Sequence, residues 1–172
     1  MPTPAYISIH GQTQGPITKD AFTAKSVGNI YQEGHEDEIL VQEIEHNIET
    51  PTDPQSGQPA GQRVHRPFTF TATLNKATPM LYQALTKGET LSKVKVKWYC
   101  TSADGQQEHF FTTKLHDATI VNISTVLPHV QNPHNAGYTQ LIKVSMAYRE
   151  IFWSHVISGT EASDDWRKPT EA

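Results

Sequence analysis

The chain has 172 residues, of which 36% are hydrophobic and 19% charged, and this composition is ordinary for a soluble protein of one domain with its own core. Its formal net charge of −4 argues against nucleic acid as the main partner, and its single cysteine excludes an intramolecular disulfide. The N-terminus lacks the pattern of a secretory signal, and no stretch approaches membrane-spanning length, so we expect cytoplasmic synthesis and no membrane insertion.

The first elements predicted in chain order are two strands. A short strand is predicted over residues 5–10, and a glycine-bounded turn follows it. After a polar stretch and an acidic loop, a second strand is predicted over residues 39–48, with Leu40, Ile44 and Ile48 on one face. Each strand would therefore have one apolar and one polar face.

Residues 49–63 are the least compact part of the sequence. The segment, ETPTDPQSGQPAGQR, contains three prolines, two glycines and no apolar residue larger than alanine, so it cannot build core. A loop of this length inside a compact domain is uncommon and is usually functional or disordered. The strands predicted on either side favour a third interpretation, an arm that projects and becomes ordered only against a partner.

Residues 64–99 are the predicted centre of the fold, because strand, helix and strand periods follow one another there. Apolar residues alternate with threonines over residues 68–74, which predicts a half-buried strand. The period is helical over residues 78–87, where Thr78 is a candidate N-cap, Pro79 stands at the first helical position and a glycine follows the end.

The strand after this helix carries a stripe of lysines. Lys93, Lys95 and Lys97 alternate with apolar residues, so they would share the polar face of a half-buried strand. This stripe fits an exposed sheet face, which is either a solvated surface or a specific contact. Cys100 belongs to the apolar set of the same strand and is predicted to be a small buried residue rather than a reactive thiol.

The last third of the chain is predicted to be further antiparallel strands. An Asp-Gly turn at residues 102–105 predicts a hairpin, followed by strands over residues 107–115, 117–126 and 138–153. The tail, residues 158–172, is polar apart from Trp166 and is expected to fray unless that indole docks. The pattern predicts a mainly β fold, an antiparallel barrel or sandwich of about seven strands with one short α-helix.

A search for catalytic or metal sites finds no constellation. The segment His35-Glu36-Asp37-Glu38 matches neither a zinc-binding helix nor a calcium loop, and a solvated turn is the favoured interpretation. His129 and His134 lack a third ligand nearby, and His109 is predicted to be a surface or cross-strand residue. No nucleophile motif or phosphate-binding loop occurs, so the sequence predicts no enzyme, cofactor or metal.

Seven blocks of sequence nevertheless resemble one known family, Hcp, the hemolysin-coregulated protein of the type VI secretion system. They occur in the same order and run through nearly the whole chain: YISIHGQTQG, GHEDEILVQE, PTDPQSGQPAGQRVHRPFTFT, LNKATPMLYQAL, VKWYCTSADGQQEHFFTTKL, YTQLIKVSMAYREI and GTEASDDWR. The resemblance implies hexameric rings that stack into the inner tube of a contractile machine and are expelled with the VgrG spike through the sheath. It also implies small effectors carried inside the ring and export without a signal peptide.

The resemblance also implies which residues serve assembly. Residues 49–63 correspond to the extended loop that contacts neighbouring subunits or rings, which makes candidates of Pro51, Asp53, Gln55, Gln58 and Arg63. Lys93, Lys95 and Lys97 are candidates for the lumen face. The alternative function is a secreted ring-shaped protein that binds the surface of target cells.

Overall fold

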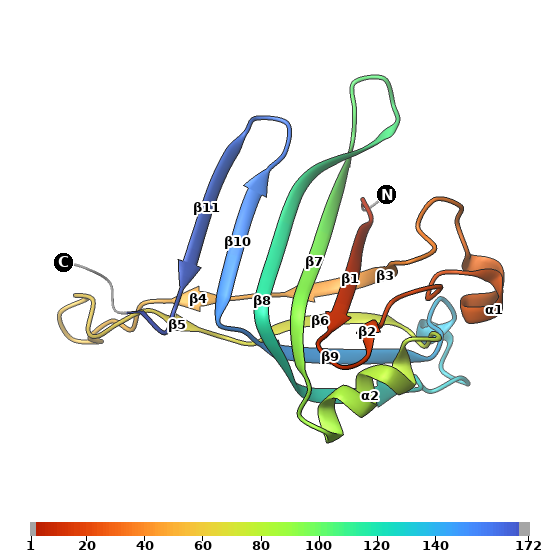
Figure 1. The fold of residues 1–172 in the computed structure, drawn as a ribbon, viewed down its shortest axis with the longest axis horizontal. Helices are drawn as coiled ribbons and strands as arrows, with labels where there is room; N and C mark the ends of the chain where they lie inside the picture. The colour runs from red at the N-terminus through yellow and green to blue at the C-terminus, as the bar shows by residue number, and fades with distance from the viewer. Residues whose placement is uncertain (1–2, 169–172) are drawn as a thin grey trace.

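The structure, a computed structural model, describes residues 3–168 and consists mainly of antiparallel strands (Figure 1). The mainly β fold predicted from the sequence is confirmed, and a four-residue helix, α1, accompanies the predicted one. The elements are, in chain order, β1 (Ala5–Gly11), β2 (Gly15–Pro16), α1 (Ala24–Val27), the 3₁₀ turn η1 (Gly28–Ile30), β3 (Ile39–Glu45), β4 (Ile48–Glu49), β5 (Val64–His65), β6 (Phe68–Thr73), α2 (Thr78–Thr86), β7 (Thr90–Thr101), β8 (Gln107–Val126), the 3₁₀ turn η2 (Pro133–Asn135), β9 (Leu141–Ala147), β10 (Glu150–His155) and β11 (Thr160–Asp165).

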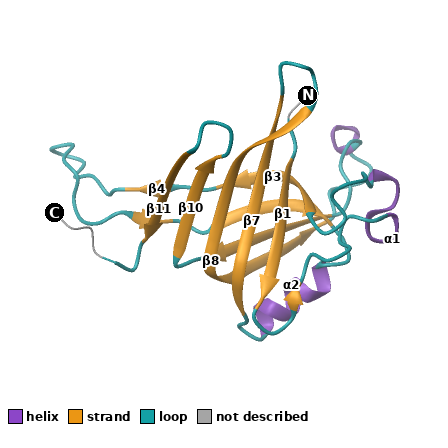
Figure 2. Cartoon of the chain, turned by 45° about the horizontal axis from the view of Figure 1, so that its top comes forward, coloured by secondary structure: helices purple, strands orange, loops and turns teal. Residues whose placement is uncertain are grey.

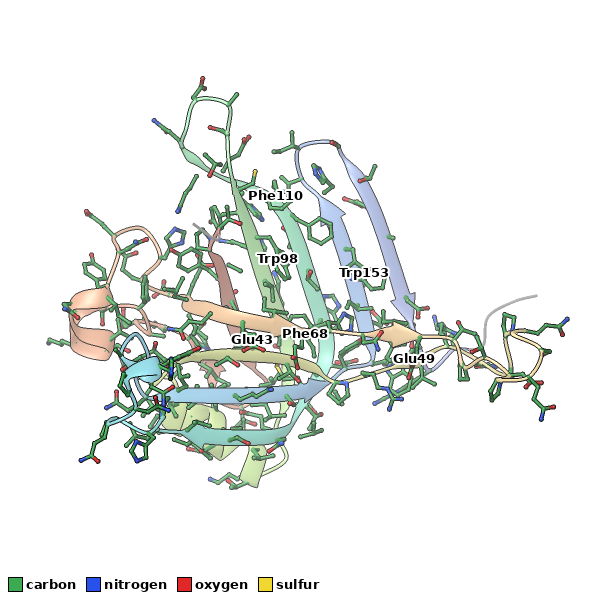
Figure 3. The ribbon with its side chains drawn as sticks, turned by 180° about the vertical axis from the view of Figure 1, so that it is seen from behind. Glu43, Glu49, Phe68, Trp98, Phe110 and Trp153 are labelled. Atoms are coloured by element: carbon green, nitrogen blue, oxygen red, sulfur yellow. The ribbon has the colours of Figure 1, made fainter. Side chains whose placement is uncertain are left out.

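The strand order closes on itself. Neighbouring strands follow the order β11-β10-β8-β7-β1-β3-β6-β9, and β9 also pairs with β8, so the strands from β8 to β9 form a closed ring. Strands β10 and β11 extend from this ring as a two-stranded wing, which Figure 2 shows beside β8. The two faces of the wing therefore continue the inner and outer faces of the ring.

Strand β8 belongs to both parts of the sheet. It pairs with β10 as far as His116 and with β9 from Thr119 onward. Between these positions Asp117 has a φ of +50°, a left-handed conformation that aspartate adopts more readily than most residues. The two strands predicted over residues 107–115 and 117–126 are consequently one strand that changes partner at Asp117.

The strand predicted over residues 138–153 is divided at the corresponding point. Strand β9 ends at Ala147 and β10 begins at Glu150, because each pairs with a different half of β8. The prediction of one continuous strand was wrong here, since alternation in sequence does not show where a strand leaves one partner for another. Tyr148 lies in this gap and is 3% exposed.

One cluster of buried apolar side chains fills the ring. Alternation predicted the inward residues of β6, β7 and β9 correctly, and each of the following is at most 1% exposed: Phe68, Phe70, Ala72, Val94, Val96, Ile142, Val144 and Met146. Helix α2 packs against β8 and buries Leu81 and Ala84 completely. Burial of such aliphatic and aromatic side chains, about 1.5–3 kcal/mol each, is the main stabilising contribution to the fold.

The ends of α2 differ slightly from the prediction. The helix ends at Thr86, one residue early, and Gly88 follows it with a φ of +64°, as a helix terminator would. Thr78 is the first helical residue, and Ala77 occupies the N-cap position. The Thr78 hydroxyl accepts a hydrogen bond from the Asn75 backbone N–H (3.2 Å), so it organises the preceding turn rather than capping the helix.

The predicted inward face of β3 was wrong because the strand contains a bulge. Its buried residues are Ile39 and Val41, at 3% and 8% exposure, whereas Leu40 is only partly buried. The pairing of β3 with β6 shifts between Val41 and Glu43, and after this shift Ile44 packs against the core. A single extra residue therefore reverses which positions face inward.

Residues 156–168, which follow β10, include a further strand and a docked indole. Residues 160–165 form β11 along β10, and the Trp166 indole packs against the core and donates to the Tyr148 carbonyl. The sequence predicted fraying unless this indole docks, and in this part of the tail the indole docks. Residues 169–172 of the predicted tail lie outside the described residues.

The β7–β8 hairpin is where the sequence predicted it. Thr101 pairs with Gln107, and Gly105 has a φ of +78°, which its missing side chain permits. The strand is bulged between Trp98 and Tyr99, so alternation is broken before Cys100. Cys100 is therefore partly exposed rather than buried.

Candidate assembly site

Residues 48–65, here called the arm, project from the body of the molecule as a narrow ribbon (Figures 1 and 2). Strands β4 and β5 pair at its root, where Ile48 lies opposite His65. Every residue from 49 to 62 is exposed, so this part of the arm buries no side chain in the core. Residues 49–62 therefore extend away from the body rather than packing on it.

The arm has hydrogen bonds of its own. Thr52 and Pro59 form an isolated bridge, and the Asp53 N–H donates to the Gln58 carbonyl at 2.8 Å. The Ala60 N–H donates to the Pro51 carbonyl at 2.7 Å, which holds the two sides together. The expectation that the arm takes shape only against a partner was therefore wrong, because the single chain already forms a hairpin there.

Four of the predicted assembly residues lie together at the outer part of the arm. Pro51 and Gln58 contribute to its paired sides, and Asp53 accepts the Gln55 backbone N–H at 2.8 Å. This hydrogen bond, together with those from Ser56, lowers the pKa of the exposed Asp53 carboxyl. The tip therefore presents an aspartate that stays ionised, together with two glutamine amides.

Arg63, the fifth predicted residue, lies at the root and contacts the C-terminal segment instead. Its Nε and one terminal nitrogen donate to the two carboxylate oxygens of Asp164, at 2.6 and 2.8 Å. The same terminal nitrogen donates to the carbonyls of Asp165 and Lys168, each at 3.0 Å. Two donors of the planar guanidinium thus pair with the two oxygens of one carboxylate, so Arg63 fixes the arm root to β11.

The contact of Arg63 continues inward through a chain of side chains that we call the anchor network: Arg63, Asp164, His65, Tyr148 and His46. His65 Nε2 lies 2.7 Å from Asp164 Oδ2, and His65 Nδ1 lies 2.7 Å from the Tyr148 hydroxyl. The same hydroxyl lies 2.6 Å from His46 Nε2. The network therefore joins the arm root, the β9–β10 junction and β11.

The chemistry of the partners fixes the direction of the His65–Asp164 hydrogen bond, and the tautomers of the two histidines set the others. An ionised Asp164 can only accept, so His65 Nε2 carries a proton and donates to it. In the tautomer with the proton on Nε2 alone, His65 Nδ1 accepts from the Tyr148 hydroxyl. The Tyr148 oxygen accepts in turn from His46 Nε2–H, so in this arrangement each of these polar groups has a hydrogen-bond partner.

Burial and neighbouring charges shift the pKa values of Tyr148, His46 and Asp164. Burial raises the pKa of Tyr148, and the nearby Asp164 charge raises it further. Burial lowers the pKa of His46, as does the neighbouring His65. The Arg63 hydrogen bonds lower the pKa of Asp164 against the opposing effect of its own partial burial.

These shifts predict acid sensitivity. Because the folded state lowers the pKa of His46, the unfolded chain binds the extra proton first, so stability falls as pH decreases below about 6.5 toward the folded pKa. Asp164, whose folded pKa is also lowered, contributes a second loss below about pH 4. The free energy of unfolding, measured with denaturant between pH 7.5 and 5, should fall less steeply with decreasing pH in His46→Asn than in the parent. Equal slopes in the two proteins would contradict the assignment to His46.

The lysine stripe lies on the opposite face of the sheet from the core. Lys93 is exposed, and Lys95 and Lys97 are partly buried. Lys97 approaches the Glu38 carboxylate at 3.4 Å, and His35 binds the same carboxylate oxygen at 3.3 Å. The three lysines thus share a face, as predicted, and they lie on the body rather than beside the arm.

The segment His35-Glu36-Asp37-Glu38 is more ordered than the predicted solvated turn. The His35 ring stacks on Tyr6 with a centroid distance of 3.8 Å and an interplanar angle of 7°. Glu38 is 9% exposed. This prediction was wrong because the loop folds back over β1, a long-range contact that no local pattern records.

His109 meets the expectation of a cross-strand residue, since its ring lies near Tyr99 on the paired strand.

Sequence reasoning missed the anchor network. Its members are spread from His46 to Asp164, so no motif of fixed spacing contains them. The only available signal was the position of Arg63 and His65 directly after a segment that could not build core.

In the described part of the chain no three His, Cys, Asp or Glu side chains are grouped as metal ligands, and no helix is long and apolar enough to cross a membrane.

The closed strand ring, the wing and the arm together form an antiparallel β architecture that is also found in known proteins. The family model described as "Type VI secretion system effector, Hcp" matches residues 6–155. The "Major exported protein" of Pseudomonas aeruginosa is 56% identical over 98% of both chains. A crystal structure of an Hcp protein has a TM-score of 0.93 at 54% identity, covering 98% of this chain and 100% of the other. The secreted protein Hcp3 from Pseudomonas aeruginosa has a TM-score of 0.81 at 47% identity, covering 97% and 100%.

These matches cover the whole architecture rather than one motif. The chain belongs to the Hcp family of type VI secretion proteins. Members of this family are secreted structural proteins, and the resemblance found in the sequence is confirmed.

Proposed function

We propose that the chain is a tube subunit of a type VI secretion system. In this proposal residues 1–172 are one tube domain, six copies close into a ring, and rings stack into a tube with effectors in the lumen. The partners are further copies of the chain, the VgrG spike, the contractile sheath and small effector proteins. The protein is cytoplasmic before firing and is then expelled outside the producing cell, with no cofactor.

The arm is the observation that carries the proposal. It extends from the body with its residues 49–62 exposed, and its root is fixed by Arg63 to Asp164 through two hydrogen bonds. A ribbon that is already paired loses little conformational freedom when it binds. The arm therefore suits repeated contact with an identical neighbour, which is what stacking of rings requires.

Exposed apolar side chains offer a second line of support. One group lies at the β8–β9 connection, where Leu127, Val130 and Tyr138 are 64%, 79% and 62% exposed. Another lies at the β10–β11 turn, where Val156 and Ile157 are 49% and 56% exposed. A ring formed by head-to-tail contacts needs two different patches on each subunit, and large exposed apolar residues favour such interfaces.

A lumen needs a polar lining, and two sheet faces can supply one. The first is the lysine stripe of β7. The second is the outer face of β6 and β9, where the Thr69 hydroxyl lies 2.9 Å from that of Ser145, and where Lys143 lies 3.8 Å from Glu45 of β3. A cysteine introduced at Lys95 or at Thr71 tests which face lines the lumen. In the assembled ring, the cysteine on the lumen face should react with a bulky maleimide more slowly than the cysteine on the other face.

Shortening the arm should abolish stacking while preserving the fold. Replacing residues 53–58 by Asn-Gly removes the tip but keeps Arg63 and the root strands. Because these residues are exposed, the melting temperature should change by no more than about 3 °C. Light scattering after size exclusion, with negative-stain images of the main peak, should show single rings in place of stacks.

The matched control alters another exposed turn. Ala103→Gly with Asp104→Asn changes the β7–β8 turn and should leave the assembly as it is in the parent. Stacked rings of the shortened protein, or its unfolding far below the parent with loss of β-sheet circular dichroism, would count against this role for the arm. A parent protein that stays monomeric at high concentration would count against the tube itself.

A further inference from the structure

The outer face of the sheet carries a compact group of lysines from two neighbouring strands. In register, Lys95 of β7 lies between Ser8 of β1 and Lys114 of β8. Lys93 and Lys97 lie two residues before and after Lys95 on the same face, because side chains alternate along a strand. We call Lys93, Lys95, Lys97 and Lys114 the lysine ridge, and Figure 2 shows β7 and β8 at the centre of this sheet.

The ridge lacks matching carboxylates. Lys97 has Glu38 at 3.4 Å, but no carboxylate in residues 3–168 lies within ion-pair distance of Lys93, Lys95 or Lys114. On the wing side, the residue paired with Lys114 is Phe152. Three of the four ammonium groups therefore depend on solvent for their counter-charge.

This arrangement disfavours the folded chain. Like charges directly opposite each other on paired strands are destabilising, and Lys95 and Lys114 form such a pair. Partial burial lowers the pKa of Lys95, and Lys97, Lys114 and Lys93 lower it further, in that order. A partner that brings negative charge to the ridge would relieve this repulsion.

The surface beside the ridge has room for a partner. A hollow of about 580 Å³ lies on one side, lined by Ser8, His10, Lys95 and Lys97 and by the acidic loop residues Glu36, Asp37 and Glu38. A second hollow of about 550 Å³ lies on the wing side and is lined by Lys114, Phe152 and Ser154 among others. Both recesses also contain carboxylates, Glu161 in the second, so they can receive the uncharged or basic side chains of a segment whose carboxylates lie on the ridge.

We propose that the lysine ridge is a docking site for an acidic segment of another protein. Carboxylates spaced along an extended or helical segment would pair with the lysines, and the neighbouring side chains would enter the two hollows. The lysine stems add apolar contact along the ridge. The inference does not depend on which way the face points in a ring, so it can hold in the lumen or outside the tube.

The observations favour an acidic polypeptide over a second copy of this chain. Several exposed carboxylates of the described residues already have partners, such as Glu45 with Lys143 and Glu49 with Arg66. They also favour a polypeptide over nucleic acid, because the ridge contains no arginine and the chain carries a net charge of −4.

The test uses a fluorescein-labelled decaglutamate peptide and fluorescence anisotropy on the full-length protein. The parent should bind the peptide, and added salt should weaken the binding because the contact is electrostatic. The triple variant Lys93→Gln, Lys95→Gln, Lys114→Gln should bind at least about tenfold more weakly. Its melting temperature should equal or exceed that of the parent, since the repulsion between Lys95 and Lys114 is removed.

The matched control removes the same charge elsewhere. Lys25→Gln, Lys76→Gln, Lys87→Gln alters three exposed lysines outside the ridge and should bind within about twofold of the parent. Equal loss in both variants, no binding by the parent, or tighter binding of a ten-nucleotide thymidine strand would overturn the proposal. A fall in the mass of the ridge variant by light scattering would assign the ridge to subunit contacts instead. If the ridge variant still forms rings but binds the peptide weakly, the docking site is supported independently of the tube proposal.

Discussion

Replacing Arg63 with alanine should loosen the arm root and the C-terminal strand together. Arg63 donates to the Asp164 carboxylate and to the Asp165 and Lys168 carbonyls, and its loss leaves Asp164 with the hydrogen bond to His65. Opening of β5 and β11 should then become more frequent while the body stays closed. Amide exchange in these strands should accelerate about tenfold or more, and exchange in β6 should change little.

Arg66 provides a control of the same residue type three positions away. It pairs with Glu49 at 2.5 Å, but the two side chains are 60% and 44% exposed, and exposed ion pairs contribute little to stability. Arg66→Ala should therefore leave exchange in β5 and β11 close to that of the parent. Equal acceleration in both variants would show that the arm root responds to any lost charge and would contradict an anchoring role for Arg63.

Anchoring at the root also bears on assembly. A ribbon held by a two-point contact keeps one direction relative to the body, whereas a ribbon on a loosened root samples many directions and loses more freedom on binding. Arg63→Ala should therefore reduce stacking even though the tip residues Asp53, Gln55 and Gln58 are unchanged. This distinguishes a positioning role for Arg63 from the direct contact that the sequence suggested for it.

Local patterns predicted the fold where strands have one partner on each side. The inward residues of β6 and β9 followed simple alternation, and the β7–β8 hairpin followed its Asp-Gly turn. Prediction failed where a strand changes partner at Asp117 and where a bulge near Gln42 reverses the faces of β3. These features depend on pairing between distant segments, which a single sequence does not display.

The candidate site shows the same division. The exposed arm was predictable because a segment rich in proline and glycine and without large apolar residues cannot build core. The anchor network was not, since His46 and Tyr148, and likewise His65 and Asp164, are about one hundred residues apart and meet only after the ring has closed. The shared face of Lys93, Lys95 and Lys97 followed from alternation, whereas the addition of Lys114 required the register between β7 and β8.

The hydroxyl of Tyr148 should contribute strongly to stability, although it is a single oxygen atom. In Tyr148→Phe the ring still fits its buried position, but His46 Nε2 and His65 Nδ1 each lose their hydrogen-bond partner. Each unsatisfied buried polar group costs about 1–3 kcal/mol, so the free energy of unfolding should fall by about 2–4 kcal/mol. For a chain of this size the melting temperature should then fall by roughly 5–15 °C.

Tyr138 offers the comparison, because it is 62% exposed and its hydroxyl reaches solvent. Tyr138→Phe should change the melting temperature by no more than about 2 °C. The acid sensitivity assigned to His46 should also change in Tyr148→Phe, since His46 then no longer donates to a fixed oxygen. A Tyr148→Phe protein as stable as Tyr138→Phe would mean that the two histidines find other partners, and the network would then not be what holds the β9–β10 junction to the arm root.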